Sequence, residues 1–168
     1  MNYLSQDPRT IFLGQAVVAK GTAMTTTIGM IPESKKIEMP VAEEMQMGIS
    51  TGLALAGLVP VSFYPRWNFM LLATNQLVGH LDKISQMSEG GYQPKVIIRV
   101  GVGSERPLHP QCQHIGDFSD AFRLMLTTVE VIQLKEPEDI FPAYEKALTR
   151  VDGRSTILVE YGDYYGEK

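Results

Sequence analysis

The chain has 168 residues, of which 44% are hydrophobic and 20% are charged, and its formal net charge is −4 at pH 7. These values are ordinary for a globular protein with one core, so a single domain spanning residues 1–168 is expected. The weak negative charge gives no reason to expect nucleic acid or an anionic membrane as a partner.

Three features of the sequence favour a cytoplasmic protein without a membrane anchor. The one cysteine, Cys112, leaves no internal disulfide and fits a reducing compartment. Residues 1–9 lack the basic and apolar regions of a signal peptide. The apolar run 52–64 is broken by Pro60, and it is shorter than the ~20 residues that a membrane helix needs.

Apolar runs and helical patterns alternate along the chain. Strands are predicted at residues 10–18, 36–39, 58–64, 95–100, 129–134 and 156–160. Pro40 disfavours helix at the residue before it, so a helix is expected to begin just after it and to end at Gly57. Further helices are predicted at 68–87, 117–126 and 137–150, whereas 20–34 and 101–116 show no clear period.

Repeated strand–helix–strand units of these lengths predict an α/β fold, a three-layer α/β/α sandwich with a largely parallel sheet. Ligands of such sheets lie outside the carboxyl ends of the strands. Residues 39–44, 64–69 and 101–116 all fall at that edge. An acidic pair, an aromatic run and two histidines are therefore expected on one rim.

The acidic pair Glu43-Glu44 lies in the first turn of the predicted helix that follows Pro40. Acids at this position commonly do no more than complement the helix dipole. However, the rest of the helix is nearly all small or apolar, so at least one of its faces must be buried. A partly buried glutamate at its start is a candidate for binding a ring nitrogen of a ligand.

Four aromatic residues follow one strand later, namely Phe63, Tyr64, Trp67 and Phe69. Such a cluster serves either as core packing or as a platform on which a flat ring stacks. Arg66 among them is suited to pair with a phosphate, a carboxylate or a neighbouring chain.

The segment from His109 to His114 contains two histidines and Cys112. It offers three metal-binding side chains but neither a fourth ligand nor a familiar zinc spacing, so no metal site is assigned to it. A Cys–His nucleophilic pair is a further option, although nothing marks a third, orienting group. A proton donor or substrate contact is the favoured role for His109.

Two phosphate-binding motifs and one metal-binding motif are missing from the chain. It has no Walker loop and no Gly-x-Gly-x-x-Gly after the first predicted strand. It also lacks a Gly-Asp-Gly motif followed by Asn, because Gly116-Asp117 and Gly162-Asp163 continue into aromatic residues.

With these residues assembled, the chain resembles the pyrimidine-binding domain of thiamine diphosphate enzymes. It is most similar to the central domain of transketolases and to the beta subunit of 2-oxoacid dehydrogenases. The resemblance covers nearly the whole chain, and its most specific parts are Pro40-Val-Ala-Glu43, Ala54-Leu-Ala-Gly57-Leu-Val-Pro60, and Phe69 with Asn75-Gln76 and Lys83. Asp7-Pro-Arg, Phe12-Leu-Gly14 and Val96-Ile-Ile-Arg99 also match.

The resemblance implies roles for particular residues. Glu43 matches the glutamate that hydrogen-bonds the aminopyrimidine ring and activates the cofactor, Phe69 matches the ring that stacks on the pyrimidine, and Trp67 stands beside it. His109 matches a histidine that faces the substrate and has a catalytic role. The same loop gives three further candidates for substrate contact, Arg106, Gln111 and His114.

Two departures from the family pattern shape the functional hypothesis. Gln15 and Ala16 stand where the family commonly has acidic residues, which puts a proton relay through that position in doubt. The chain also lacks the diphosphate-and-magnesium domain. A separate subunit is therefore expected to bind the diphosphate and Mg²⁺, with thiamine diphosphate held between chains of an α2β2 hetero-oligomer.

The function expected is the pyrimidine-binding subunit of a split, transketolase-like transferase of carbohydrate metabolism. Such an enzyme cleaves and forms C–C bonds next to the carbonyl of a ketose or 2-oxoacid. Two alternatives remain open: a beta-type component of a 2-oxoacid dehydrogenase or decarboxylase, and a non-catalytic interaction module that keeps the fold.

Overall fold

A computed structural model of the chain describes residues 1–19, 23–103 and 110–162. Its centre is a six-stranded sheet in the order β2-β1-β3-β4-β6-β5, in which every neighbouring pair is parallel. The strands are β1 (Thr10–Gly14), β2 (Lys36–Glu38), β3 (Val59–Tyr64), β4 (Ile97–Val102), β5 (Glu130–Leu134) and β6 (Thr156–Tyr161). The predicted α/β fold is confirmed, and all the described strands share one direction.

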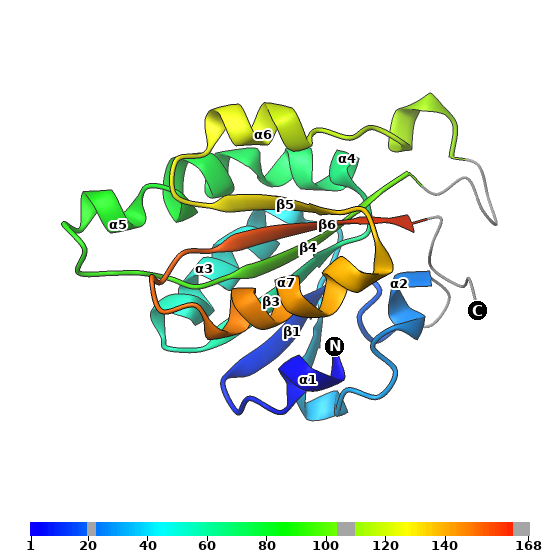
Figure 1. Ribbon diagram of the computed structural model, residues 1–168, viewed down its shortest axis with the longest axis horizontal. Helices are drawn as coiled ribbons and strands as arrows, with labels where there is room; N and C mark the ends of the chain where they lie inside the picture. The colour runs from blue at the N-terminus through cyan, green and yellow to red at the C-terminus, as the bar shows by residue number, and fades with distance from the viewer. Residues whose placement is uncertain (20–22, 104–109, 163–168) are drawn as a thin grey trace.

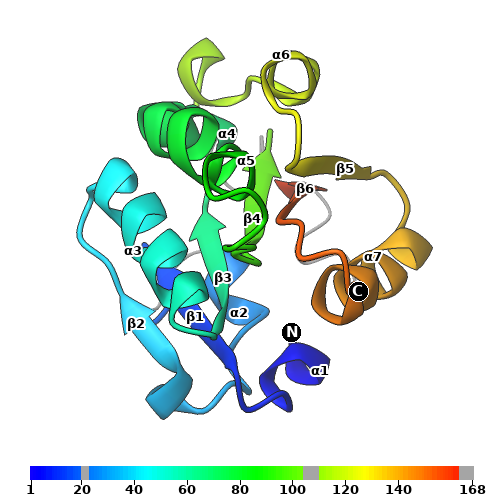
Figure 2. The same cartoon turned by 90° about the vertical axis from the view of Figure 1, so that its left-hand side faces the viewer.

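Helices cover both faces of the sheet (Figure 1). The α-helices are α1 (Asn2–Ser5), α2 (Ala23–Thr26), α3 (Glu43–Leu55), α4 (Trp67–Met70), α5 (Ile84–Met87), α6 (Ser119–Met125) and α7 (Pro137–Thr149). Shorter or wider helical turns are η1 (Glu33–Lys35), η2 (Leu71–Ala73), η3 (Asn75–Leu81) and η4 (Cys112–His114). Figure 2 shows α3, α4, α5 and α6 on one side of the sheet and α1 and α7 on the other.

The two-residue alternation of side chains along the central strands builds a separate core on each face. In β4, Ile98 and Val100 join Met47, Trp67 and other side chains of the α3–α6 layer. The preceding residue of that strand, Ile97, packs with the α1–α7 layer. Buried on both sides, the central strands are nearly continuous hydrophobic runs, which is typical of a parallel sheet.

One buried ion pair lies on the α7 face of the sheet. Arg99 of β4 donates from Nε and Nη2 to Glu160 Oε2 of β6, at 3.0 and 2.7 Å. The hydroxyl of Tyr144 on α7 donates to the other oxygen of Glu160. The guanidinium also lies over the ring of Phe63, 5.3 Å from its centroid. These contacts join β3, β4, β6 and α7 across one face.

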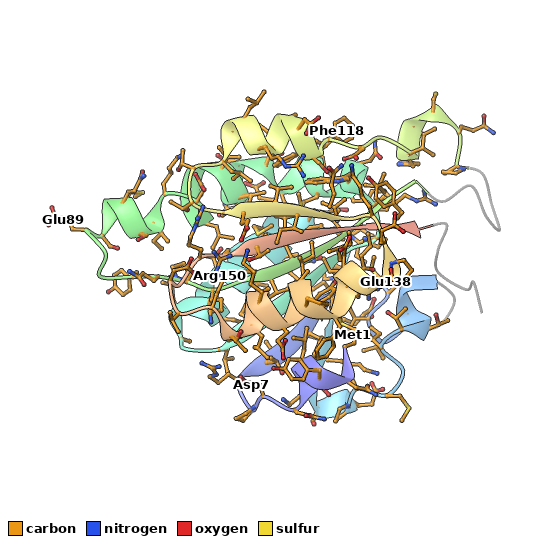
Figure 3. The ribbon with its side chains drawn as sticks, viewed as in Figure 1. Met1, Asp7, Glu89, Phe118, Glu138 and Arg150 are labelled. Carbon is orange, nitrogen blue, oxygen red and sulfur yellow. The ribbon has the colours of Figure 1, made fainter. Side chains whose placement is uncertain are left out.

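The helix α7 returns the chain from the carboxyl edge of the sheet to the amino edge. Glu138 and Arg150 mark its two ends in Figure 3. It begins with a capping box in which Glu136 and Asp139 exchange side-chain and backbone hydrogen bonds, which pairs N–H groups that a helix start leaves free. At the amino edge, Arg150 donates to Glu130 Oε2 at 2.9 Å.

The prediction of one continuous helix over residues 68–87 is wrong. The segment is divided into α4, the 3-10 helix η2, the π-helix η3 and α5. The N–H of Asp82 donates to Leu77 O at 2.9 Å, five residues back. Widened turns of this kind occur where side chains impose local demands on the helix, and here the demand comes from Asp82.

Asp82 fastens the end of η3 to the segment that leads into β5. Its buried carboxylate accepts hydrogen bonds from the backbone N–H groups of Thr127, Thr128 and Val129, at 2.7 to 3.0 Å. Burial alone would raise the pKa of the Asp82 carboxyl. Hydrogen bonds from the Lys83 ammonium and from these three N–H groups outweigh that effect and hold its pKa well below the usual range.

Replacing Asp82 by Asn is expected to lower the free energy of unfolding at pH 7 by about 2–4 kcal/mol, because buried N–H groups lose a charged acceptor. The pKa is lower in the folded state, so the stabilisation is present above the unfolded-state value of about 3.9. It is lost as the pH falls further, at about 1 kcal/mol per pH unit. Urea unfolding at pH 7 and pH 3 measures the difference.

The control is Asp120→Asn on α6, whose carboxylate is largely exposed and pairs with Arg123 at 2.6 Å. Exposed pairs contribute little, so the urea midpoint should hardly move. Equal midpoint shifts for the two variants would refute an anchoring role for Asp82.

Candidate functional site at the carboxyl edge of the sheet

The loops that follow the parallel strands all leave from one edge of the sheet. The predicted rim segments 39–44 and 64–69, and the described parts of 101–116, lie at the carboxyl ends of β2, β3 and β4. This arrangement is confirmed by the strand order and by the common strand direction. The edge is where an α/β sheet binds its ligands.

Glu43 is the first residue of α3 and is only 4% exposed. Its Oε1 accepts a hydrogen bond from Gln15 Nε2 at 2.9 Å. The hydroxyl of Tyr64, at the end of β3, donates to the Glu43 backbone oxygen at 3.3 Å. Among the described residues, Oε2 of Glu43 accepts no hydrogen bond. The carboxylate is thus held by one oxygen and has the other available.

Glu44, its neighbour in sequence, is exposed and turns elsewhere. Its Oε1 accepts long hydrogen bonds, both 3.5 Å, from the side-chain amides of Asn75 and Gln76. The two acids therefore have different environments, and only Glu43 is buried at the edge of the sheet.

The strand predicted over residues 10–18 stops at Gly14 because of the backbone there. Gly14 has φ +150°, and a Cβ at this position would lie 2.5 Å from the backbone oxygen of Phe63. Ala16 then adopts φ +57°, a conformation that costs a non-glycine residue free energy. The chain leaves the sheet here, and Gln15 between these two residues reaches toward Glu43.

Glu38, at the end of β2, holds the turned loop in place. Its carboxylate accepts the backbone N–H groups of Ala16, Val17, Val18 and Ala19 at 2.6 to 3.2 Å. Burial would raise the pKa of the Glu38 carboxyl, but the hydrogen bonds from Val18, Ala16, Ala19 and Val17 outweigh it and lower that pKa. Consecutive N–H groups that converge on one anion form a nest.

An open groove of about 530 Å³ lies beside the start of α3. Its lining residues come from the first turn of α3 and from the η2–η3 region, and are Ala42, Glu43, Glu44, Met45, Leu72 and Gln76. Several apolar side chains at and near this groove are exposed, with Val41 at 80%, Leu72 at 64% and Met45 at 46%. The groove is wide open to solvent.

Phe69 is half-buried on α4 and does not line this groove. Its ring contacts the ring of His114, with the centroids 5.2 Å apart. Arg66 supports the contact by donating from Nη1 to the backbone oxygens of His114 and Gly103, at 3.0 and 2.8 Å. The structure thus brings Phe69 and His114 together, as a second part of the same edge.

Trp67 is fully buried, and its ring stacks on Phe122 of α6 with the centroids 4.8 Å apart. It is a core residue of the α4–α6 layer, so neither face of its indole is free for a ligand. Gln111 is exposed and adopts φ +62° just before η4. Arg106 and His109 lie outside the residues that the structure describes.

Sequence reasoning missed two residues of this edge. Gln15 stood out only as a departure from an acidic pattern, and its hydrogen bond to Glu43 depends on a backbone turn that the sequence does not reveal. Glu38 carried no signal beyond its place at the end of a short strand. A carboxylate following a strand and preceding Met-Pro would have been the only available hint.

The part of the chain that the structure describes contains no group of three His, Cys, Asp or Glu side chains arranged to hold a metal ion. None of its helices combines the length and apolar character required to cross a bilayer.

The strand order, the common strand direction and the two helix layers define the fold class of the chain. An all-parallel six-stranded sheet with helices on both faces matches the transketolase-like fold of solved structures. One is a split gene transketolase, an inactive beta4 tetramer, with a TM-score of 0.71 and 16% identity over 94% of this chain and 46% of that chain. Another is a putative thiamin diphosphate-dependent enzyme isolated from Mycobacterium smegmatis, with a TM-score of 0.60 and 13% identity over 94% of this chain and 28% of that chain.

The sequence comparisons agree with this class. The chain is 29% identical over 115 residues to the pyruvate dehydrogenase E1 component subunit beta of Drosophila melanogaster, which covers 65% of this chain and 32% of that protein. It is 26% identical over 145 residues to a Mycobacterium tuberculosis 3-methyl-2-oxobutanoate dehydrogenase subunit beta, covering 82% and 40%. No family model matches the chain.

These relatives are beta subunits of 2-oxoacid dehydrogenases, and the similar structures include a split transketolase. The resemblance to the pyrimidine-binding domain of thiamine diphosphate enzymes is therefore confirmed. The chain spans less than half the length of the curated relatives it matches, 32% and 40% in the two cases above.

Replacing Glu38 by Gln is expected to speed hydrogen exchange at the amides of residues 16–19 by about tenfold or more, because a neutral amide oxygen is a weaker acceptor than a carboxylate. Hydrogen exchange followed by NMR measures each amide separately. Glu33→Gln is the matched control, since this exposed glutamate pairs with Lys36 and should leave those amides unchanged. Unaltered exchange in Glu38→Gln would show that the nest does not hold the loop.

Proposed function

We propose that the chain is the pyrimidine-binding subunit of a thiamine diphosphate-dependent, transketolase-like enzyme that cleaves and forms C–C bonds next to a carbonyl. The observation that carries the proposal is Glu43. It lies buried at the start of α3, on the carboxyl edge, with one carboxylate oxygen held by Gln15 and the other free beside an open groove. The similarity to beta subunits and to split transketolase supports this assignment.

The donor set fits an aminopyrimidine ring. Oε2 of Glu43 would accept or share the hydrogen of one hydrogen bond with a ring nitrogen, and a hydrogen bond to a charged group is stronger than one between neutral groups. Phe69 is a half-buried ring at the same edge and suits stacking on a flat heterocycle. When bound, thiamine diphosphate supplies the electron sink for C–C cleavage, whereas the chain supplies orientation and electrostatics.

A partner subunit is part of the proposal. The groove beside Glu43 is open to solvent, and exposed Val41, Met45 and Leu72 lie at or near it. Exposed apolar side chains grouped around a site mark a surface that another protein covers. The partner would bind the diphosphate and Mg²⁺ and complete the site, in an α2β2 assembly. The single domain of residues 1–168 would form the pyrimidine half, and His109, Arg106, Gln111 and His114 would face a ketose or 2-oxoacid substrate.

A second candidate is the beta-type component of a 2-oxoacid dehydrogenase or decarboxylase. The observation that favours it is the similarity to the beta subunits of pyruvate and 3-methyl-2-oxobutanoate dehydrogenases. The substrates separate the two candidates. A 2-oxoacid releases CO₂ in the second case, and a partner carrying lipoyl groups would accept the fragment. A ketose donor with an aldehyde acceptor supports the first.

The test is to purify the tagged chain from its own organism with the partner that accompanies it, and to assay the complex with thiamine diphosphate and Mg²⁺. The partner is expected to carry the Gly-Asp-Gly and downstream Asn that this chain lacks. Glu43→Gln should lower kcat by at least about 10²-fold, because activation of the cofactor loses its acidic partner.

The comparison variant is Glu44→Gln, since Glu44 is adjacent but turned toward Asn75 and Gln76. The kcat of Glu44→Gln should fall less than tenfold, because the proposal gives the Glu44 carboxylate no part in cofactor activation. Full activity in Glu43→Gln would refute the catalytic proposal and favour the non-catalytic module. Circular dichroism of both variants checks that the fold is kept.

A further inference from the structure

Gln15 makes the side-chain hydrogen bond that orients the Glu43 carboxylate. We propose that Gln15 is a positioning residue that fixes which oxygen of Glu43 exchanges a proton with the ligand. The inference rests on the proposed function, because the ligand in question is the aminopyrimidine ring. It begins from the 2.9 Å contact between Gln15 Nε2 and Glu43 Oε1.

The backbone leaves Gln15 little freedom to turn away. On one side, a side chain at Gly14 would collide with the Phe63 backbone oxygen at 2.5 Å, which keeps β1 tight against β3. On the other side, Ala16 is held at φ +57° while its N–H donates to Glu38 Oε1 at 2.7 Å. Two neighbours with constrained backbones determine the direction in which the side chain between them leaves the chain.

The chemistry of the amide then distinguishes the two carboxylate oxygens. The Gln15 NH₂ group only donates, so Oε1 must act as an acceptor in this contact. An oxygen that already accepts a hydrogen bond is the poorer site for a proton, so a proton on the Glu43 carboxyl is favoured on Oε2, which accepts no hydrogen bond from the described residues. One oxygen is held by Gln15, and the other is available to a ligand.

Gln15 also cannot ionise. A glutamate here would lie about 3 Å from Glu43, and two carboxylates that close cannot both be ionised, so the pair would retain a proton to higher pH. Gln15 therefore brings no second ionisable group to the Glu43 carboxylate.

Other titratable groups near Glu43 make different contacts. The Tyr64 hydroxyl reaches the Glu43 backbone oxygen and not its carboxylate, and burial, with the charge of Glu43, raises the Tyr64 pKa despite a hydrogen bond with Ser62. The Glu44 carboxylate contacts Asn75 and Gln76. Among the described residues, Gln15 is thus the one side chain that hydrogen-bonds the Glu43 carboxylate.

The first experiment tests the hydrogen bond without cofactor or activity. In the chain labelled with ¹⁵N and bound to its partner, one side-chain amide proton of Gln15 should resonate downfield of those of exposed glutamines and exchange more slowly. Glu43→Ala should abolish both signatures, since the acceptor is lost. Unchanged Gln15 signals in Glu43→Ala would overturn the proposal whatever the complex catalyses.

The second experiment uses the complex with thiamine diphosphate and Mg²⁺, and compares Gln15→Met, Gln15→Glu and the exposed control Gln86→Met. Methionine keeps the length of glutamine but donates no hydrogen bond, so kcat should fall about tenfold, the value of one hydrogen bond to a charged group. Gln15→Glu should move the acidic limb of the pH–rate profile to higher pH, because the carboxylate pair shares a proton. A purely structural role would lower activity without moving that limb.

The outcomes separate this inference from the proposed function. If Glu43→Gln abolishes turnover while Gln15→Met and Gln15→Glu keep the wild-type kcat and pH profile, the positioning role fails and the proposed function stands. If Glu43→Gln retains turnover, the proposed function fails, and the inference about Gln15 fails with it. The inference is supported if kcat falls about tenfold in Gln15→Met and the pH–rate profile is displaced in Gln15→Glu. Gln86→Met should show neither change.

Discussion

The carboxyl edge of this sheet depends on the four hydrogen bonds that the Glu38 carboxylate accepts from residues 16–19. One anion fixes four consecutive N–H groups, which no sheet or helix would otherwise pair. The loop after β1 consequently turns sharply at Ala16, and the side chain of Gln15 is presented to α3. An edge strand of only three residues, β2, therefore sets the geometry of a carboxylate on the first helix that follows it.

Buried polar groups at the amino edge of the sheet are well paired. At the amino edge Asp82 collects hydrogen bonds from Lys83 and residues 127–129, and Lys95 donates to two backbone oxygens. In the described chain, the buried side-chain atoms without a partner belong to α3, α4 and η4, and are Gln46 Oε1, Trp67 Nε1, Asn68 Oδ1 and His114 Nδ1. Of these atoms, His114 Nδ1 belongs to the part of the carboxyl edge where the His114 ring contacts Phe69, and an unpaired polar group is expected where a protein binds a ligand.

Much of the fold could be predicted because its strands are continuous apolar runs and its helix starts carry clear signals. Pro40 and the two acids after it indicated a helix start just after Pro40, close to the observed first residue of α3, Glu43, and the parallel sheet followed from the alternation of elements. The divided helix at 67–87 could not be predicted, since the carboxylate of Asp82 binds residues some 45 positions away. The burial of Trp67 against Phe122, and the contact of Gln15 with Glu43, likewise depend on distant segments that local patterns do not describe.

The stacked pair of Trp67 and Phe122 gives the protein an intrinsic fluorescent probe. Trp67 is the one tryptophan in the sequence, and its indole is fully buried with an N–H that finds no acceptor among the described residues. An indole in such apolar surroundings emits at short wavelength, and exposure to water moves the emission to the red. A red shift of the intrinsic fluorescence therefore reports the separation of α4 from α6. The probe, Trp67, lies two residues before Phe69 in the chain.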